Sequence, residues 1–216
     1  MKVEVVIPES LSEITLGQYQ KYLKIQDSND DPRFLQIKMI EIFCGVPSDY
    51  VLGMKLSDTN SIAESLNELF EDKPQLVRKT KIGSKEYGFI PNLEDISLGE
   101  YIDLDTYVSD WENMHLTMNV LYRPIQNKYG DRYSIDDYKS GDGLHMKDIT
   151  MDCVISSLLF FYRLGMDLST TILNYLKEAE ESRLVQFLSS QKNGDGINQF
   201  TRSLRETLQE LKISLN

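Results

Sequence analysis

The segment Leu11–Tyr19, with the sequence LSEITLGQY, returns at Leu93–Tyr101 as LEDISLGEY. Five of the nine positions are identical, and the other four are mostly chemically similar. Each copy follows a β-like stretch that ends in Ile-Pro, at 3–8 and at 87–91. The repetition predicts a small unit that occurs twice in the chain, although two unrelated helices with similar starting residues would give the same pattern.

The repeated residues predict the start of a helix in both copies. Thr15 and Ser97 are the expected N-cap residues, because a Gln or Glu follows each of them three positions later and completes a capping box. An Ile stands before each cap and a Tyr four residues after it, which is the spacing of a hydrophobic staple. Each copy is therefore interpreted as strand, turn and firmly capped helix.

The rest of the sequence predicts a mainly α protein with a small β-hairpin or sheet, an α+β fold with a helical bundle in its C-terminal half. The expected regions are two capped-helix units over 1–123 with a hairpin at 75–90, a polar excursion over 124–147 with a short strand at 132–135, and a helical region over 148–216. Helices are expected at about 32–44, 57–70, 98–108, 112–122, 148–164, 168–178, 180–191 and 197–214.

Charge and cysteine content narrow the classes of partner. The net charge of −11 argues against a nucleic-acid partner and against docking on an anionic membrane. The most apolar run, 153–162, is too short to cross a bilayer, and the N-terminus does not resemble a signal peptide. Two cysteines in apolar contexts are a poor disulfide framework. We therefore expect a chain made in a reducing cytoplasm.

The sequence indicates no catalytic site, no cofactor and no metal. Phosphate-binding and dinucleotide-binding glycine motifs are missing. His115 and His145, the only histidines, lack the paired spacing of metal ligands. His115 is expected half-buried and satisfied within a helix, and His145 exposed in the polar excursion. The acidic run at 27–31 lacks the Gly and the Glu of a calcium loop. An enzyme would need a site assembled from scattered residues.

Two charge blocks leave two interpretations open. Seven acids and no Lys or Arg occur over 94–112, and four basic residues precede them over 78–85. The acids are interpreted as a solvated helix face. Alternatively, the basic hairpin of one copy meets the acidic helix of the next, and such heterologous contacts generate rings or filaments.

The last predicted helix, 197–214, carries the partner-binding candidates. Its apolar residues recur every three or four positions in one narrow seam: Ile197, Phe200, Leu204, Leu208, Leu211 and Leu215. A narrow seam is typical of a coiled-coil or bundle contact. Packing against the chain's own core is the alternative, and the Gly-containing break at 193–196 permits either arrangement.

The pattern Ile-[Thr/Ser]-Leu-Gly-[Gln/Glu]-Tyr, together with the helix end LYRPI at 121–125, resembles small structural and assembly proteins of tailed bacteriophages, of the ring, connector or tail-assembly-chaperone type, as in crAss-like and other phages of Bacteroidetes. The resemblance implies a non-enzymatic, oligomeric protein that is made in the bacterial cytoplasm, resides in the virion tail or connector, and binds itself or other phage structural proteins. The alternative is a cytoplasmic chaperone or adaptor that binds an apolar surface of its partner.

Overall fold

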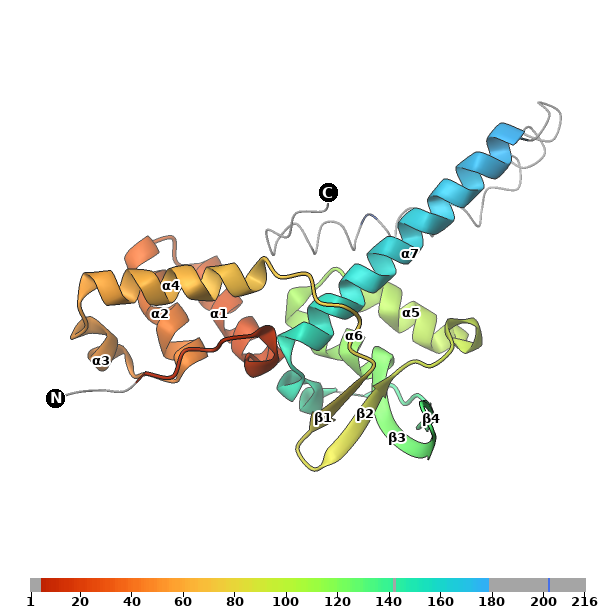
Figure 1. The fold of residues 1–216 in the computed structure, drawn as a ribbon, viewed down its shortest axis with the longest axis horizontal. Helices are drawn as coiled ribbons and strands as arrows, with labels where there is room; N and C mark the ends of the chain where they lie inside the picture. Colours follow the sequence, from red (N-terminus) through yellow and green to blue (C-terminus); the bar gives the residue numbers. More distant parts are fainter. Residues whose placement is uncertain (1–4, 142, 179–201, 203–216) are drawn as a thin grey trace.

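The computed structural model describes residues 5–141, 143–178 and 202. Its helices and strands form an α+β fold that is mainly helical, as predicted (Figure 1). The N-terminal elements are η1 (Leu11–Glu13), α1 (Leu16–Ser28), α2 (Pro32–Cys44), α3 (Ser48–Leu52) and α4 (Leu56–Phe70). The remaining elements are β1 (Lys79–Ile82), β2 (Lys85–Phe89), η2 (Leu93–Asp95), α5 (Leu98–Tyr107), η3 (Trp111–Asn113), α6 (Met114–Leu121), β3 (Tyr122–Tyr129), β4 (Arg132–Ile135), η4 (Leu144–Asp148) and α7 (Met151–Glu178).

Both copies of the repeated motif have the predicted start of a helix. Each begins with a short 3₁₀ helix and continues through one extended residue and the N-cap into an α-helix. Thr15 and Ser97 cap α1 and α5, and both capping boxes are complete. The expected strand before the first copy is wrong for the described residues 5–8, which have no strand assignment. The second copy does follow a strand, β2.

Helices α1 to α4 pack together at one end of the molecule, and α1 contacts η4, α7 and η3 of the other part (Figure 1). The chain around Ile14 and Thr15 pairs with the chain that enters α7. Leu16 N donates to Ile149 O at 2.8 Å, and Met151 N donates to Ile14 O at 2.8 Å. These hydrogen bonds fix the first copy of the motif against the N-terminus of α7.

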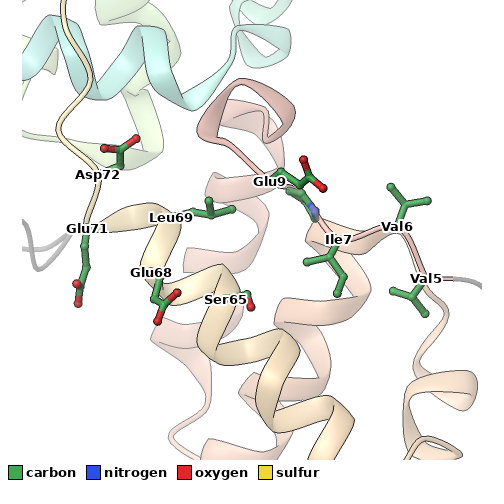
Figure 2. A pocket seen from close by; sticks show the side chains of 10 residues that line it. Val5, Val6, Ile7, Glu9, Ser65, Glu68, Leu69, Glu71 and Asp72 are labelled. Carbon is green, nitrogen blue, oxygen red and sulfur yellow. The ribbon is translucent and has the colours of Figure 1, made fainter.

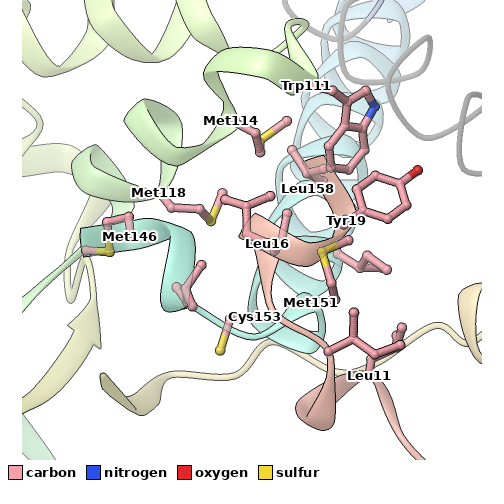
Figure 3. Close-up of a cluster of buried hydrophobic side chains, with 14 of the residues drawn as sticks. Leu11, Leu16, Tyr19, Trp111, Met114, Met118, Met146, Met151, Cys153 and Leu158 are labelled. Atoms are coloured by element: carbon pink, nitrogen blue, oxygen red, sulfur yellow. The ribbon is translucent and has the colours of Figure 1, made fainter. Parts of the chain in front are cut away.

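The core is continuous through this junction. Side chains from the start of α1, from α6, from η4 and from the first half of α7 interdigitate there (Figure 3). Leu16, Met118, Met146 and Met151 are all fully buried. The unbranched methionines can fill the irregular space where the four elements meet.

The four strands form one antiparallel sheet in the order β1-β2-β3-β4. Gly83 supplies the positive φ of 58° that a tight hairpin turn needs between β1 and β2. The predicted hairpin is confirmed, although its first strand begins at Lys79. Strand β3 was not expected, because residues 124–129 were interpreted as polar excursion. Pro124 has no N–H to donate, and its carbonyl accepts from Asp136 N at 2.9 Å. It lies beside a register shift between Ile125 and Asn127, and such irregularities are places where a strand tolerates proline.

The helices predicted at 148–164 and 168–178 form one continuous helix, α7. Gly165 weakens a helix interior by only about 1 kcal/mol, which does not end it. In Figure 1 the first half of α7 lies in the body, and its second half extends well beyond the other described elements. The helices predicted at 180–191 and 197–214 lie outside the described residues.

Candidate protein-binding surface

Helix α5 is anchored to the sheet through its first turn. Ser97 N donates to Glu100 Oε2 at 2.7 Å, and Glu100 N donates to Ser97 Oγ at 3.3 Å. The same carboxylate forms an ion pair with Arg123 of β3, with 2.7 Å between Oε1 and Nη2. The two side chains are only 5% and 13% exposed. This buried pair determines which face of α5 points inward.

A second anchor lies further along the same helix. Tyr138, in the chain after β4, donates its hydroxyl to Asp103 Oδ2. Burial, together with this carboxylate, raises the pKa of Tyr138 to about 12. Leu104 and Val108 are buried on the same inward side. Glu100, Leu104 and Val108 follow the i, i+4, i+8 spacing of one helix face.

The outward face of α5 carries three exposed apolar side chains and one acid, Asp105. Leu98, Tyr101 and Ile102 all lie exposed on it, at i, i+3 and i+4. This surface differs sharply from the first copy of the motif: Leu16 is 0% exposed where Leu98 is 74% exposed, and Tyr19 is 6% exposed where Tyr101 is 44% exposed. The same local sequence therefore builds a core element in one place and a surface element in the other.

An apolar pocket continues this surface between α5, η2 and α7. Its volume is about 190 Å³. Its walls are Leu93, Ile96, Tyr101, Leu104, Phe161, Leu164, Gly165 and Leu168. Ile96 and Tyr101 are the predicted staple pair, and here they line the pocket. We call the pocket together with Leu98, Tyr101 and Ile102 the α5–α7 surface.

The basic block is fully exposed, whereas the acidic block is exposed only in part. All four basic residues of the hairpin region are exposed, and Lys79 Nζ lies 5.2 Å from the ring centroid of Tyr133. In the acidic block, Glu94, Asp95, Asp105 and Glu112 are exposed, but Glu100 is buried. The interpretation as a solvated face is thus wrong at Glu100, which is buried and paired with Arg123. The sequence did not indicate this pair, because its two residues are 23 positions apart.

The histidines lie as predicted. His115 is buried within α6, with Nδ1 3.5 Å from Gln20 Nε2. His145 is exposed, and its ring centroid is 5.9 Å from that of Tyr87. In the described part of the chain, no three His, Cys, Asp or Glu side chains are grouped to hold a metal ion. None of the helices described is long and apolar enough to span a membrane.

A wide hollow lies between the N-terminal segment and α4, with a volume of about 900 Å³. Figure 2 shows Leu69 pointing toward the segment around Ile7, whereas Glu71 points away from it. Its ionisable lining residues are all acids: Glu9, Glu68, Glu71 and Asp72. Its one hydroxyl group, on Ser65, has no histidine, lysine or arginine beside it among the lining residues.

The predicted partner-binding seam, Ile197, Phe200, Leu204, Leu208, Leu211 and Leu215, lies outside the described residues. Sequence reasoning missed the α5–α7 surface. A signal was present, because the apolar residues of α5 fall at 98, 101, 102, 104 and 108, more positions than one inward face can bury. No protein-family model, curated protein or solved structure matches this chain.

Proposed function

We propose that the chain is a non-enzymatic structural or assembly component of a tailed bacteriophage, and that it acts through protein–protein contacts in an oligomer. The observation that carries the proposal is the α5–α7 surface, an apolar helix face beside an apolar pocket. The phage class comes from the sequence resemblance alone.

Clustering is what makes this surface significant. Single exposed apolar side chains are normal on folded proteins, whereas contiguous patches mark interaction sites. Leu98, Tyr101 and Ile102 share one helix face, and Tyr101 also lines the pocket. Burying one such side chain stabilises a complex by about 1.5–3 kcal/mol, so three together can dominate the free energy of an interface.

The glycine of each motif copy supports the same conclusion. A Cβ atom on Gly17 would lie 3.1 Å from Lys147 O, so this glycine allows the η4 backbone to approach α1 closely. A Cβ atom on Gly99 would meet nothing within 4 Å. The helix surface at Gly99 could therefore be approached as closely as the surface at Gly17, but no element of the described chain packs against it.

The pocket suits a side chain of a protein partner better than a small molecule. Its volume of about 190 Å³ is below the roughly 300–1,000 Å³ of small-molecule sites.

A cytoplasmic chaperone or adaptor would use the same apolar surface to cover a partner's exposed side chains. Solution mass separates the two roles, because a structural component assembles with itself and an adaptor stays monomeric until its partner binds.

The test is light scattering coupled to size-exclusion chromatography on the purified chain and on two matched variants. We expect an oligomer for the unmodified chain and the 25.0 kDa monomer for Leu98→Ser/Ile102→Ser. The control variant, Leu52→Ser/Leu56→Ser, alters two exposed leucines at the opposite end of the molecule and should keep the oligomer (Figure 1). A monomeric unmodified chain would contradict the proposal.

A further inference from the structure

We infer that the α5–α7 surface binds residues 197–215 of a second copy of this chain. The inference rests on the proposed function and names the occupant of the surface. Three observations support it: the charge around the surface, the composition of the segment, and the direction in which α7 carries the chain.

The rim of the α5–α7 surface is acidic along η2 and α5, whereas α7 adds the exposed Arg163. Glu94, Asp95 and Asp105 are exposed beside the apolar residues of η2 and α5. No Lys or Arg occurs between Lys85 and Arg123, and Arg123 is itself engaged by Glu100. A fitting partner therefore presents an apolar stripe flanked by cations. Two α5–α7 surfaces facing each other would bring two acidic rims together, which costs free energy.

The segment 197–215 has the required composition. Its apolar residues recur at spacings of three and four, and between them lie three cations, Arg202, Arg205 and Lys212, and two acids, Glu206 and Glu210. On a helix these spacings give one stripe, which matches the single row formed by Leu98, Tyr101 and Ile102. The basic residues would then lie near the acidic rim, where they set orientation and add about 0–1 kcal/mol each.

Helix α7 leads the chain away from the surface. Leu168 lines the pocket, and the ten residues from there to Glu178 advance about 15 Å along the helix axis. Figure 1 shows this half of α7 extending beyond the body of the molecule. The chain continues from that point for 38 residues, to 216. These 38 residues are long enough for the segment to reach a neighbouring molecule.

We call residues 197–215 the tail and the α5–α7 surface the face. A contact between the tail of one copy and the face of the next is heterologous. Each molecule then has one free donor segment and one free acceptor surface, so assembly continues until a ring closes or a filament forms. This arrangement makes a prediction that no face-to-face dimer shares: two variants that each fail to assemble should assemble with each other.

The experiment uses two full-length variants. The tail variant carries Leu204→Ser and Leu208→Ser, and the face variant carries Leu98→Ser and Ile102→Ser. Each alone should be a folded monomer by circular dichroism and light scattering. An equimolar mixture should give a heterodimer of twice 25.0 kDa and nothing larger, because one intact tail meets one intact face.

Three outcomes would overturn the inference. A tail variant that remains oligomeric, while the face variant is monomeric, would show that another segment occupies the surface, and the proposed function would survive. A tail variant that unfolds would place the seam in the chain's own core. A mixture that stays monomeric would show that tail and face do not meet between copies. If the proposed function is wrong, the unmodified chain is itself monomeric, which distinguishes this case from the three outcomes above.

Discussion

Leu16 and Leu98 occupy the same position of a repeated nine-residue motif, yet the first is fully buried and the second is 74% exposed. The backbone around both is the same, with a 3₁₀ turn, an extended residue, a capping box and an α-helix. The difference lies in what packs on each copy. The first copy pairs with the start of α7, whereas no element among the described residues covers the apolar face of the second copy.

The capping boxes are expected to stabilise both copies equally. Replacing Thr15 or Ser97 with Ala removes the side-chain acceptor for the third N–H of its helix. Each change should lower the free energy of unfolding by about 1 kcal/mol, measured by urea denaturation. Ser57→Ala serves as the control, because Ser57 lies on an exposed face of α4 without a capping role. An unchanged midpoint for either cap variant would contradict the assignment.

The motif glycines should respond with opposite sign to the same substitution. Gly17→Ala places a Cβ atom 3.1 Å from Lys147 O, so η4 must shift, and the variant should be destabilised. Gly99→Ala meets no neighbouring atom and should stabilise the monomer by up to about 1 kcal/mol, because Ala loses less backbone entropy than Gly in a helix. Thermal unfolding of the two variants side by side checks this. Equal shifts would mean that the two copies are packed alike.

Local rules account for what the sequence could predict. Capping boxes, the helix end at Gly45 and the hairpin turn at Gly83 depend on neighbours within a few residues. The exposure of Leu98 and the pairing of Glu100 with Arg123 depend on distant segments, and two copies of one motif cannot reveal such a difference. Strand β3 escaped prediction because Pro124 and its polar neighbours are unusual in a strand.

Breaking the ion pair between Glu100 and Arg123 should cost far more stability than breaking a surface pair. Arg123→Met leaves a nearly buried carboxylate without its partner and should cost about 3–5 kcal/mol in urea unfolding. Glu100→Gln removes the charge but retains an acceptor for the capping box. Because either change alone breaks the same ion pair, the double variant should lose less stability than the sum of the two single variants.

The exposed pair of Glu86 and Lys128 is the matched control for this cycle. Glu86→Gln should leave the midpoint of urea unfolding nearly unchanged, because exposed ion pairs contribute little to stability. Additive losses for Glu100→Gln and Arg123→Met would show that the two groups do not interact in solution.

The two thiols predict how stability depends on pH. Burial raises the pKa of both Cys44 and Cys153 to about 11. The native chain thus keeps both protons at a pH where unfolded thiols, with a pKa of about 8.5, have lost theirs. The thiol contribution to stability is complete below about pH 8 and declines as the pH rises toward 11. Urea unfolding at about pH 8 and 9.5 should show a larger loss for the unmodified chain than for Cys44→Ala/Cys153→Ala. Equal losses would contradict this account.

The central claim is that an assembly covers the outward face of α5. Amide hydrogen exchange at two protein concentrations, below and above the onset of assembly, tests it most directly. We expect the amides of α5 (Leu98–Tyr107) to exchange more slowly at the higher concentration, and those of α4 (Leu56–Phe70) to exchange at the same rate in both. Identical exchange of α5 at both concentrations, in a chain that does assemble, would contradict the claim.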